Sequence, residues 1–283
     1  MRWHAAMALA LGGLSALITT QVNAQSTLWV RPAATAEVAW RGMLPAEGSG
    51  VGSSGQMLYP APGVAGLLVA IFAHAAINQG VQSAARKREQ EEADKVLEPY
   101  LPALRAWPAP ALWEAALTAA KPALSLQTLG TTPPAGDQVV VDVAPVFTLS
   151  QDEGVLIADV AIKRTAATGA PATESVVRVV SSPHSAADAR AHWSADEGQR
   201  LKTAAAQMLA HALVLNEQLA NNTGADTPTR THRYLQGSVE RSERAQMLAG
   251  DCARAVLRTL RGWLLSVPLQ AKEGEACASS TPF

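Results

Sequence analysis

The chain has 283 residues, of which 48% are hydrophobic and 17% charged, and its formal net charge is −1. This composition is ordinary for a globular protein, and the length suffices for one large domain or two small ones. Because the charge is balanced and neither end carries an acidic or basic tail, nucleic acid is not indicated as a partner. The preference for Ala and for Arg over Lys is typical of a bacterial protein.

Residues 1–24 have the pattern of a cleavable secretory signal peptide. Arg2 supplies a positive start, residues 5–18 are apolar without a charged side chain, and Val22-Asn23-Ala24 places small residues before the cleavage point. The apolar run is shorter than the roughly 20 residues that a membrane-spanning helix needs. We therefore expect cleavage after Ala24 and a mature protein in the periplasm or outside the cell.

Two short extended segments, at residues 28–30 and 38–40, are expected next as edge strands. Residues 45–63 are rich in Gly and Pro and are expected to form a loop. Within that loop, residues 50–55 match the glycine spacing of a dinucleotide-binding turn. Since neither a preceding parallel strand nor a following helix is indicated, we expect no nucleotide and no other cofactor.

A long helix is expected over residues 63–97, apolar in its first half, charged in its second, and stopped by Pro99. Three interpretations of the apolar half remain open: a buried core helix, a helix that inserts partly into a membrane or a partner's groove, and a membrane anchor over residues 64–80. The candidate membrane or partner face consists of Val64, Leu67, Leu68, Ile71 and Phe72.

The middle of the chain predicts a helix at 110–120 and then an antiparallel meander of three strands between residues 138 and 180. A capping-box pattern at Ser194 to Glu197 predicts the start of an amphipathic helix over 194–220. A last long helix is expected over 239–264. These elements predict an α+β fold, with a small antiparallel sheet of about three to five strands covered by long helices.

The only cysteines, Cys252 and Cys277, are expected to form a disulfide, because an exported protein meets an oxidising environment. By restricting the unfolded chain, such a bridge would stabilise the folded protein by about 3 kcal/mol. The alternative is a pair of unbridged thiols. A membrane-spanning segment at 64–80 would oppose the bridge, since it would leave both cysteines in a reducing compartment.

Three arginines of the last predicted helix, Arg254, Arg258 and Arg261, are spaced so that they share one helix face. Guanidinium groups in a row are able to hold phosphate or carboxylate, which makes this face a candidate anion-binding surface. A solvated helix face is the simpler interpretation.

Four polar residues, His184, Asp188, His192 and Asp196, gather between the predicted meander and the capped helix. Their spacing matches no metal-binding motif and no nucleophile motif, so we assign no catalytic residue and no metal site. An exported hydrolase or metal-dependent enzyme that uses His184 and His192 remains an alternative.

The function that these patterns favour is a binding or scaffolding role without enzymatic activity in the periplasm or cell envelope. The expected partner is an envelope protein or a membrane surface. We expect a signal peptide at 1–24, an N-terminal segment at 25–125 and an α+β domain at 126–283; one continuous domain formed by the last two is the alternative.

Overall fold

A computed structural model of the protein describes most of the chain beyond residue 27. The described ranges are 28–32, 37–45, 81–121, 123–128, 138–166, 172–220, 227–251 and 253–269.

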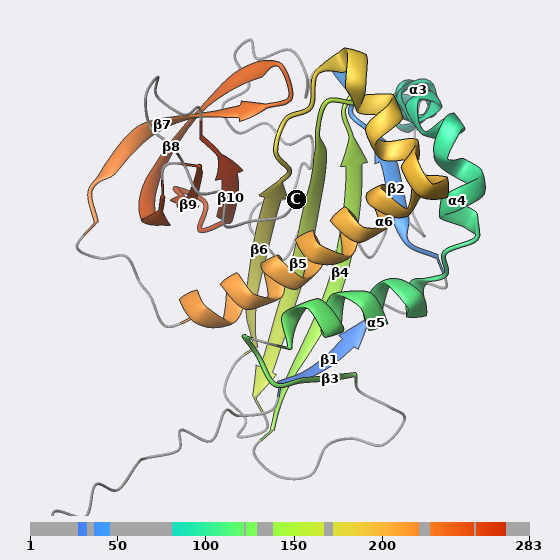
Figure 1. Cartoon of the computed structure of the whole chain (residues 1–283). Coiled ribbons are helices and arrows are strands. Elements are labelled where there is room, and N and C mark those ends of the chain that lie inside the picture. Colours follow the sequence, from blue (N-terminus) through green and yellow to red (C-terminus); the bar gives the residue numbers. More distant parts are fainter. Residues whose placement is uncertain are drawn as a thin grey trace, which may run out of the picture.

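The described strands form one mixed sheet of ten strands (Figure 1). The strands are β1 (Leu28–Pro32), β2 (Ala39–Gly42), β3 (Leu126–Thr128), β4 (Val139–Leu149), β5 (Leu156–Ala166), β6 (Thr173–Val180), β7 (Thr229–Gln236), β8 (Val239–Gly250), β9 (Arg254–Thr259) and β10 (Leu264–Pro268). Their order is β3-β1-β4-β5-β6-β10-β9-β8-β7, and β2 also pairs with β4. The expectation of a small antiparallel sheet covered by long helices was therefore wrong.

The predicted meander is confirmed as β4, β5 and β6, which pair antiparallel in chain order. On one face of these strands lie Phe147, Val160 and Val177, all fully buried. Valine-rich strands suit this central position, because branched side chains pack well on a pleated surface that is covered.

The two short N-terminal segments are strands, as expected, and both lie parallel to β4. Residues 28–32 pair with the first half of β4 and residues 39–42 with its second half. β1 is not an edge strand, because β3 pairs with its other side. The sheet edge near β1 is therefore formed by the three residues of β3, a strand that was not predicted from the sequence.

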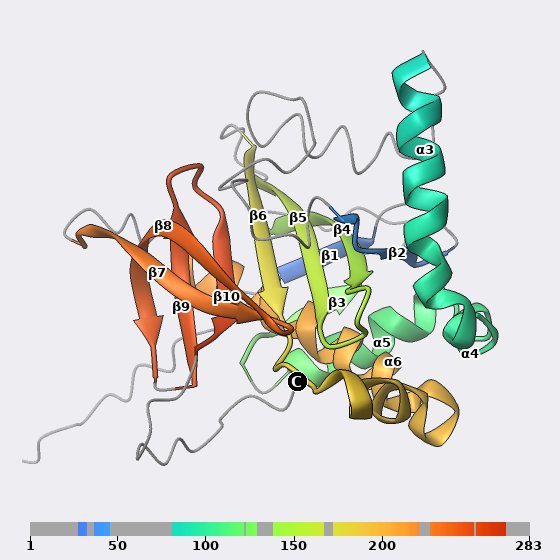
Figure 2. The same cartoon turned by 90° about the horizontal axis from the view of Figure 1, so that it is seen from above.

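Helices cover one face of the central strands (Figure 2). The helical elements are α3 (Val81–Ala93), the 3-10 helix η1 (Asp94–Tyr100), α4 (Leu101–Arg105), α5 (Ala109–Ala120) and α6 (Ala186–Leu219). The main hydrophobic core lies between the sheet and α5 and α6, and it joins Leu28, Leu112, Phe147 and Leu209. None of the helices in the described ranges combines the length and apolar character that a membrane crossing requires.

The predicted helix at 110–120 is confirmed as α5, but Pro99 does not stop the helix before it. Pro99 lies inside η1, which continues directly into α4. Of the helix expected over 63–97, the structure describes the part from Val81, and its apolar half lies outside the described residues.

The helix predicted over 194–220 ends as expected but starts earlier, at Ala186, and is interrupted. Ala195 is extended, and Asp196, Glu197 and Gly198 have φ angles of 53°, 57° and 77°. The residues of the predicted capping box thus form a left-handed break between two helical segments. The second segment carries the predicted apolar face, which includes the buried Leu201 and Met208.

The helix expected over 239–264 is wrong, because these residues form β8 and β9 and lead into β10. The segment is rich in helix-forming Glu, Arg and Ala, yet each strand pairs with its neighbour in the sheet. Pairing between distant residues here outweighs the local helical preference. In β8, exposed and partly buried residues alternate from Val239 to Glu243, which is the strand period.

Within this sheet, strands β7 to β10 form a lobe that lies beside strands β1 to β6, which we call the main sheet (Figures 1 and 2). It joins the main sheet through β10, which pairs parallel with β6 over only three residues. A second core cluster, which includes Ile157, Val180, Leu257 and Val267, lies at this junction.

Candidate functional site

Several residues singled out in the sequence lie outside the described residues. They are Cys252, Cys277, Val64, Leu67, Leu68, Ile71 and Phe72, together with the glycine-rich stretch at 50–55. The disulfide, the apolar face and the anchor at 64–80 therefore stay predictions.

The structure does not bring the three predicted arginines together as one exposed row. Arg254 and Arg258 lie on strand β9, and Arg261 lies in the turn that follows it. Arg254 is buried, whereas Arg258 is partly buried and its Nη2 lies 3.5 Å from the carbonyl oxygen of Leu219, near the C-terminal end of α6. The spacing of the three arginines would give a common face only on a helix, and these residues form a strand and a turn instead.

Arg254 has a structural environment. Its Nη2 donates to the carbonyl oxygens of Val180, at 2.7 Å, and Ser266, at 3.0 Å. The Ser266 hydroxyl also lies 2.9 Å from Nε2 of His211 on α6. Burial and the nearby Arg254 lower the pKa of His211 to about 4, and burial lowers the pKa of Arg254 to about 10. These groups connect α6, β6 and β10 inside the protein.

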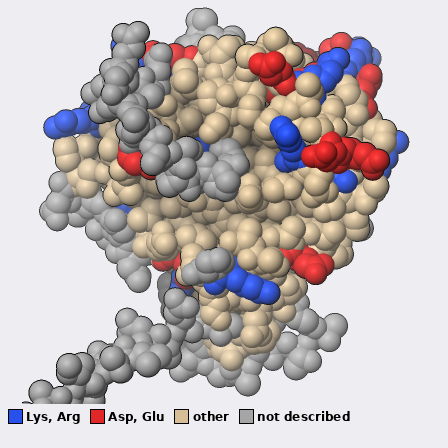
Figure 3. Space-filling view, viewed as in Figure 1, with Lys and Arg blue, Asp and Glu red and all other residues tan. Residues whose placement is uncertain are grey.

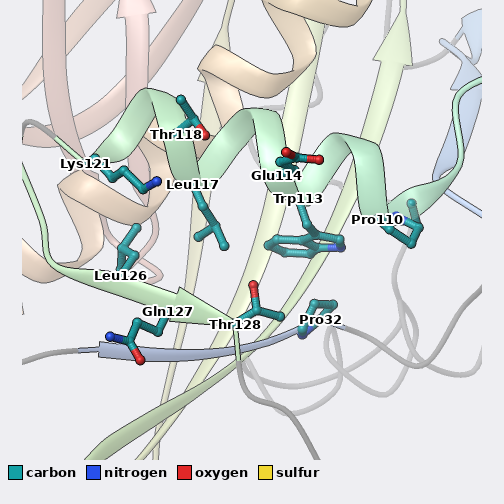
Figure 4. A pocket seen from close by; sticks show the side chains of 11 residues that line it. Pro32, Pro110, Trp113, Glu114, Leu117, Thr118, Lys121, Leu126, Gln127 and Thr128 are labelled. Carbon is teal, nitrogen blue, oxygen red and sulfur yellow. The ribbon is translucent and has the colours of Figure 1, made fainter.

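A groove with a volume of about 570 Å³ lies between helix α5 and strand β3 (Figure 4). Trp113 and Leu117 of α5 point toward the strands, and Leu126 lies in the strand opposite them. The rim carries one acid, Glu114, and one base, Lys121, both exposed. The groove therefore has an apolar floor and a polar rim without net charge, as binding sites for apolar groups commonly do.

The strand beside this groove has an open backbone edge among the described residues. Leu28 donates its N–H to the carbonyl oxygen of Ser125 at 2.9 Å, and Leu28 is the register partner of Leu126. In a parallel pair this places Gln127 with its backbone groups toward β1. Backbone direction alternates along a strand, so Leu126 and Thr128 direct their N–H and C=O groups away from β1.

Surface charge does not mark a site on the face seen in Figure 1. Acidic and basic side chains are interspersed there, and a broad uncharged area crosses its middle (Figure 3). A partner of this face would be held mainly by shape and apolar contact, because no extended potential of one sign lies there to attract it.

A second hollow, of about 520 Å³, lies where strand β6 leads into helix α6, and it contains both predicted histidines. The rings of His184 and His192 stack with centroids 3.8 Å apart, and both meet the buried Trp193 edge to face. Burial lowers the pKa of both histidines, with further contributions from His192 on His184 and from Arg200 on His192. The lowered pKa of each ring favours its neutral form at pH 7.

Of the other two residues of this predicted group, the structure brings only Asp196 to the hollow. Asp188 instead accepts a hydrogen bond from the Ser185 hydroxyl at 2.6 Å. In the described part of the chain, no group of three or more His, Cys, Asp or Glu side chains is placed to hold a metal ion. The stacking of the two imidazole rings does not by itself test whether the protein is a hydrolase or a metal-dependent enzyme. That alternative therefore stays a prediction.

Comparison with known protein families, curated proteins and solved structures gave no match.

The turn between β4 and β5 holds the histidine hollow in place, a role that the sequence did not reveal. Glu153 is buried at φ 56° and accepts hydrogen bonds from the Tyr100 hydroxyl and from the guanidinium of Arg190. Its backbone carbonyl accepts a bond from the indole N–H of Trp193 at 2.7 Å. The nearby Gly154 carbonyl accepts the backbone N–H of His184. The sequence indicated a turn here, but not these partners.

Proposed function

We propose that this protein is an exported binding protein of the cell envelope, without enzymatic activity, whose groove between α5 and β3 receives an extended apolar segment of a partner protein. The open backbone edge of β3 beside an apolar groove is the observation that carries this proposal. Export is inferred from the signal-peptide pattern of residues 1–24.

An extended segment suits this site because it would pair with the open edge of β3 and also fill the apolar groove. Its backbone would pair with the outward N–H and C=O groups of Leu126 and Thr128 and so extend the sheet by one strand. Alternate side chains of that strand would point to the same side and reach the groove beside Trp113 and Leu117. Charges at Glu114 and Lys121 would contribute little affinity, since exposed ion pairs are weak.

The experiment is a selection from a displayed library of random peptides on the mature protein, followed by binding measurements with two variants. Thr128→Pro removes the outward N–H of Thr128 without removing a hydrogen bond to β1, and proline is tolerated on edge strands. Thr128→Ala keeps that N–H and serves as the matched control. We expect enriched peptides with alternating apolar residues, whose affinity falls about tenfold in Thr128→Pro and stays near the wild-type value in Thr128→Ala.

Enriched peptides that bind both variants equally would contradict the proposal, and so would a selection that enriches nothing. Circular dichroism of Thr128→Pro checks that the variant is folded. If it is not, Thr118→Trp on the exposed rim of the groove fills the site without touching the sheet, and it should abolish binding.

A further inference from the structure

The histidine hollow contains two opposite charges that the fold keeps apart. Asp196 and Arg200 both line it, both are exposed, and neither forms an ion pair among the described residues. The Arg200 Nη1 instead lies within hydrogen-bond distance of Nδ1 of His192, at 3.4 Å.

In a regular helix these two residues would neutralise each other. They are four positions apart, which is the spacing at which an acid and a base on one helix meet. The left-handed conformation of Asp196, Glu197 and Gly198 interrupts the helix between them. Left-handed backbone costs energy at Asp196 and Glu197, which are not glycine, and such strain is concentrated at binding sites.

The remaining lining is uncharged and combines the apolar Trp193 and Ala204 with several polar side chains. The His192 Nδ1 faces an N–H donor, so its Nε2 carries the ring proton and is able to donate. The ring nitrogens of His184 have no hydrogen-bond partner among the described residues. Thr203 and Gln207 add a hydroxyl and an amide from the next turns of α6.

We propose that this hollow binds a small zwitterion of the amino-acid class, either a free amino acid or a short peptide. The Arg200 guanidinium holds the ligand's carboxylate, and the Asp196 carboxylate holds its ammonium group. The neutral histidines and Thr203 supply hydrogen bonds without adding charge. A simple anion is opposed by Asp196 and a simple cation by Arg200, so only a ligand with both charges satisfies the site. This inference does not depend on the groove beside β3.

The test uses the mature protein and single amino acids and glycyl dipeptides as probes, with binding followed by NMR shift changes and calorimetry. Acetate and methylammonium, which each carry one of the two charges, are tested at the same concentration. We expect at least one zwitterion to bind with a Kd of millimolar order or tighter, while acetate and methylammonium bind at least about tenfold more weakly.

Variants locate the binding. Arg200→Gln and Asp196→Asn should each weaken the bound zwitterion about tenfold or more, because each removes one charge-assisted contact. Lys202→Gln on the same helix and Asp188→Asn remove equal charges outside the lining and should leave binding unchanged. Arg200→Lys keeps the charge and should restore part of the affinity, which loss of folding could not explain.

The proposal would be overturned by an absence of zwitterion binding at millimolar concentration, or by binding that Arg200→Gln and Asp196→Asn leave intact. Equal binding of acetate would also overturn it, because that would make the hollow an anion site.

Discussion

At the scale of single residues, buried polar groups define how stability depends on pH. His211 lies against Ser266 and Arg254, and its pKa of about 4 is well below the 6.5 of a free histidine. The unfolded chain therefore takes up a proton between pH 6.5 and 4 that the folded protein does not. The stabilising contribution of the neutral, buried His211 is thus fully present above pH 6.5 and is lost as the pH falls toward 4.

His211→Gln removes this titration. We compare the free energy of unfolding of wild type with that of the variant. Between pH 7 and pH 4, this difference should shift against wild type by on the order of 3 kcal/mol. Urea unfolding of both proteins across this range measures it. A stability difference independent of pH would show that His211 is not buried in its neutral form.

Tyr100 makes a second residue-scale prediction. Its hydroxyl donates to the buried carboxylate of Glu153, and burial and that bond raise its pKa. Tyr100→Phe should lower the free energy of unfolding by about 1–3 kcal/mol, because the carboxylate loses a donor. Tyr234→Phe is the control: Tyr234 is also buried, but its hydroxyl has no hydrogen bond among the described residues. Equal losses in both variants would contradict the role of Glu153.

At the scale of elements, substitutions at the break in α6 test how tightly this helix packs against α4. Gly198 has φ 77°, and a Cβ there would lie 2.8 Å from the Cβ of Ala103 in α4. Gly262 has φ 81° with no atom within 4 Å of the same position. Both glycines carry the left-handed strain of a substitution, and only Gly198 adds a clash.

Thermal unfolding of Gly198→Ala and Gly262→Ala separates the two effects. We expect Gly262→Ala to cost about 1 kcal/mol and Gly198→Ala about 1–3 kcal/mol more, since α4 and α6 must move apart. If the two variants lose the same stability, the break in α6 does not pack tightly on α4.

Elements with strong local signals were predictable, and elements made by distant pairing were not. The valine alternation of β4 and the turn at residues 152–154 predicted the meander, and the apolar spacing of α5 predicted its helix. Residues 239–264 have helix-forming composition but become strands through pairing with β7 and β10. The sequence placed His184 and His192 in one loop region, yet the groove beside β3 needs a three-residue strand too short to leave a pattern.

At the scale of the whole molecule, the lobe of β7 to β10 is joined to the main sheet by a small junction. β6 and β10 pair over three residues, and Arg254 links the same two strands through the carbonyls of Val180 and Ser266. Arg254→Met keeps an unbranched, largely apolar side chain, although a shorter one, and removes both bonds. It should lower the free energy of unfolding by about 2–4 kcal/mol, because buried carbonyls lose their donor.

Amide hydrogen exchange shows which part of the protein loses stability in this variant. In Arg254→Met the amides of β7 to β10 should exchange faster relative to wild type than those of β4 and β5. Uniform acceleration over both parts would mean that the lobe and the main sheet unfold as one unit.

The central claim is that the open edge of β3 pairs with an extended partner, and amide exchange tests it most directly. The exchange rates of Leu126, Gln127 and Thr128 are measured by NMR with and without a selected peptide. We predict that the outward amides of Leu126 and Thr128 become protected on binding, while Gln127, already directed toward β1, changes little. Unchanged exchange at Leu126 and Thr128 with saturating peptide would contradict strand addition and, with it, the proposed function.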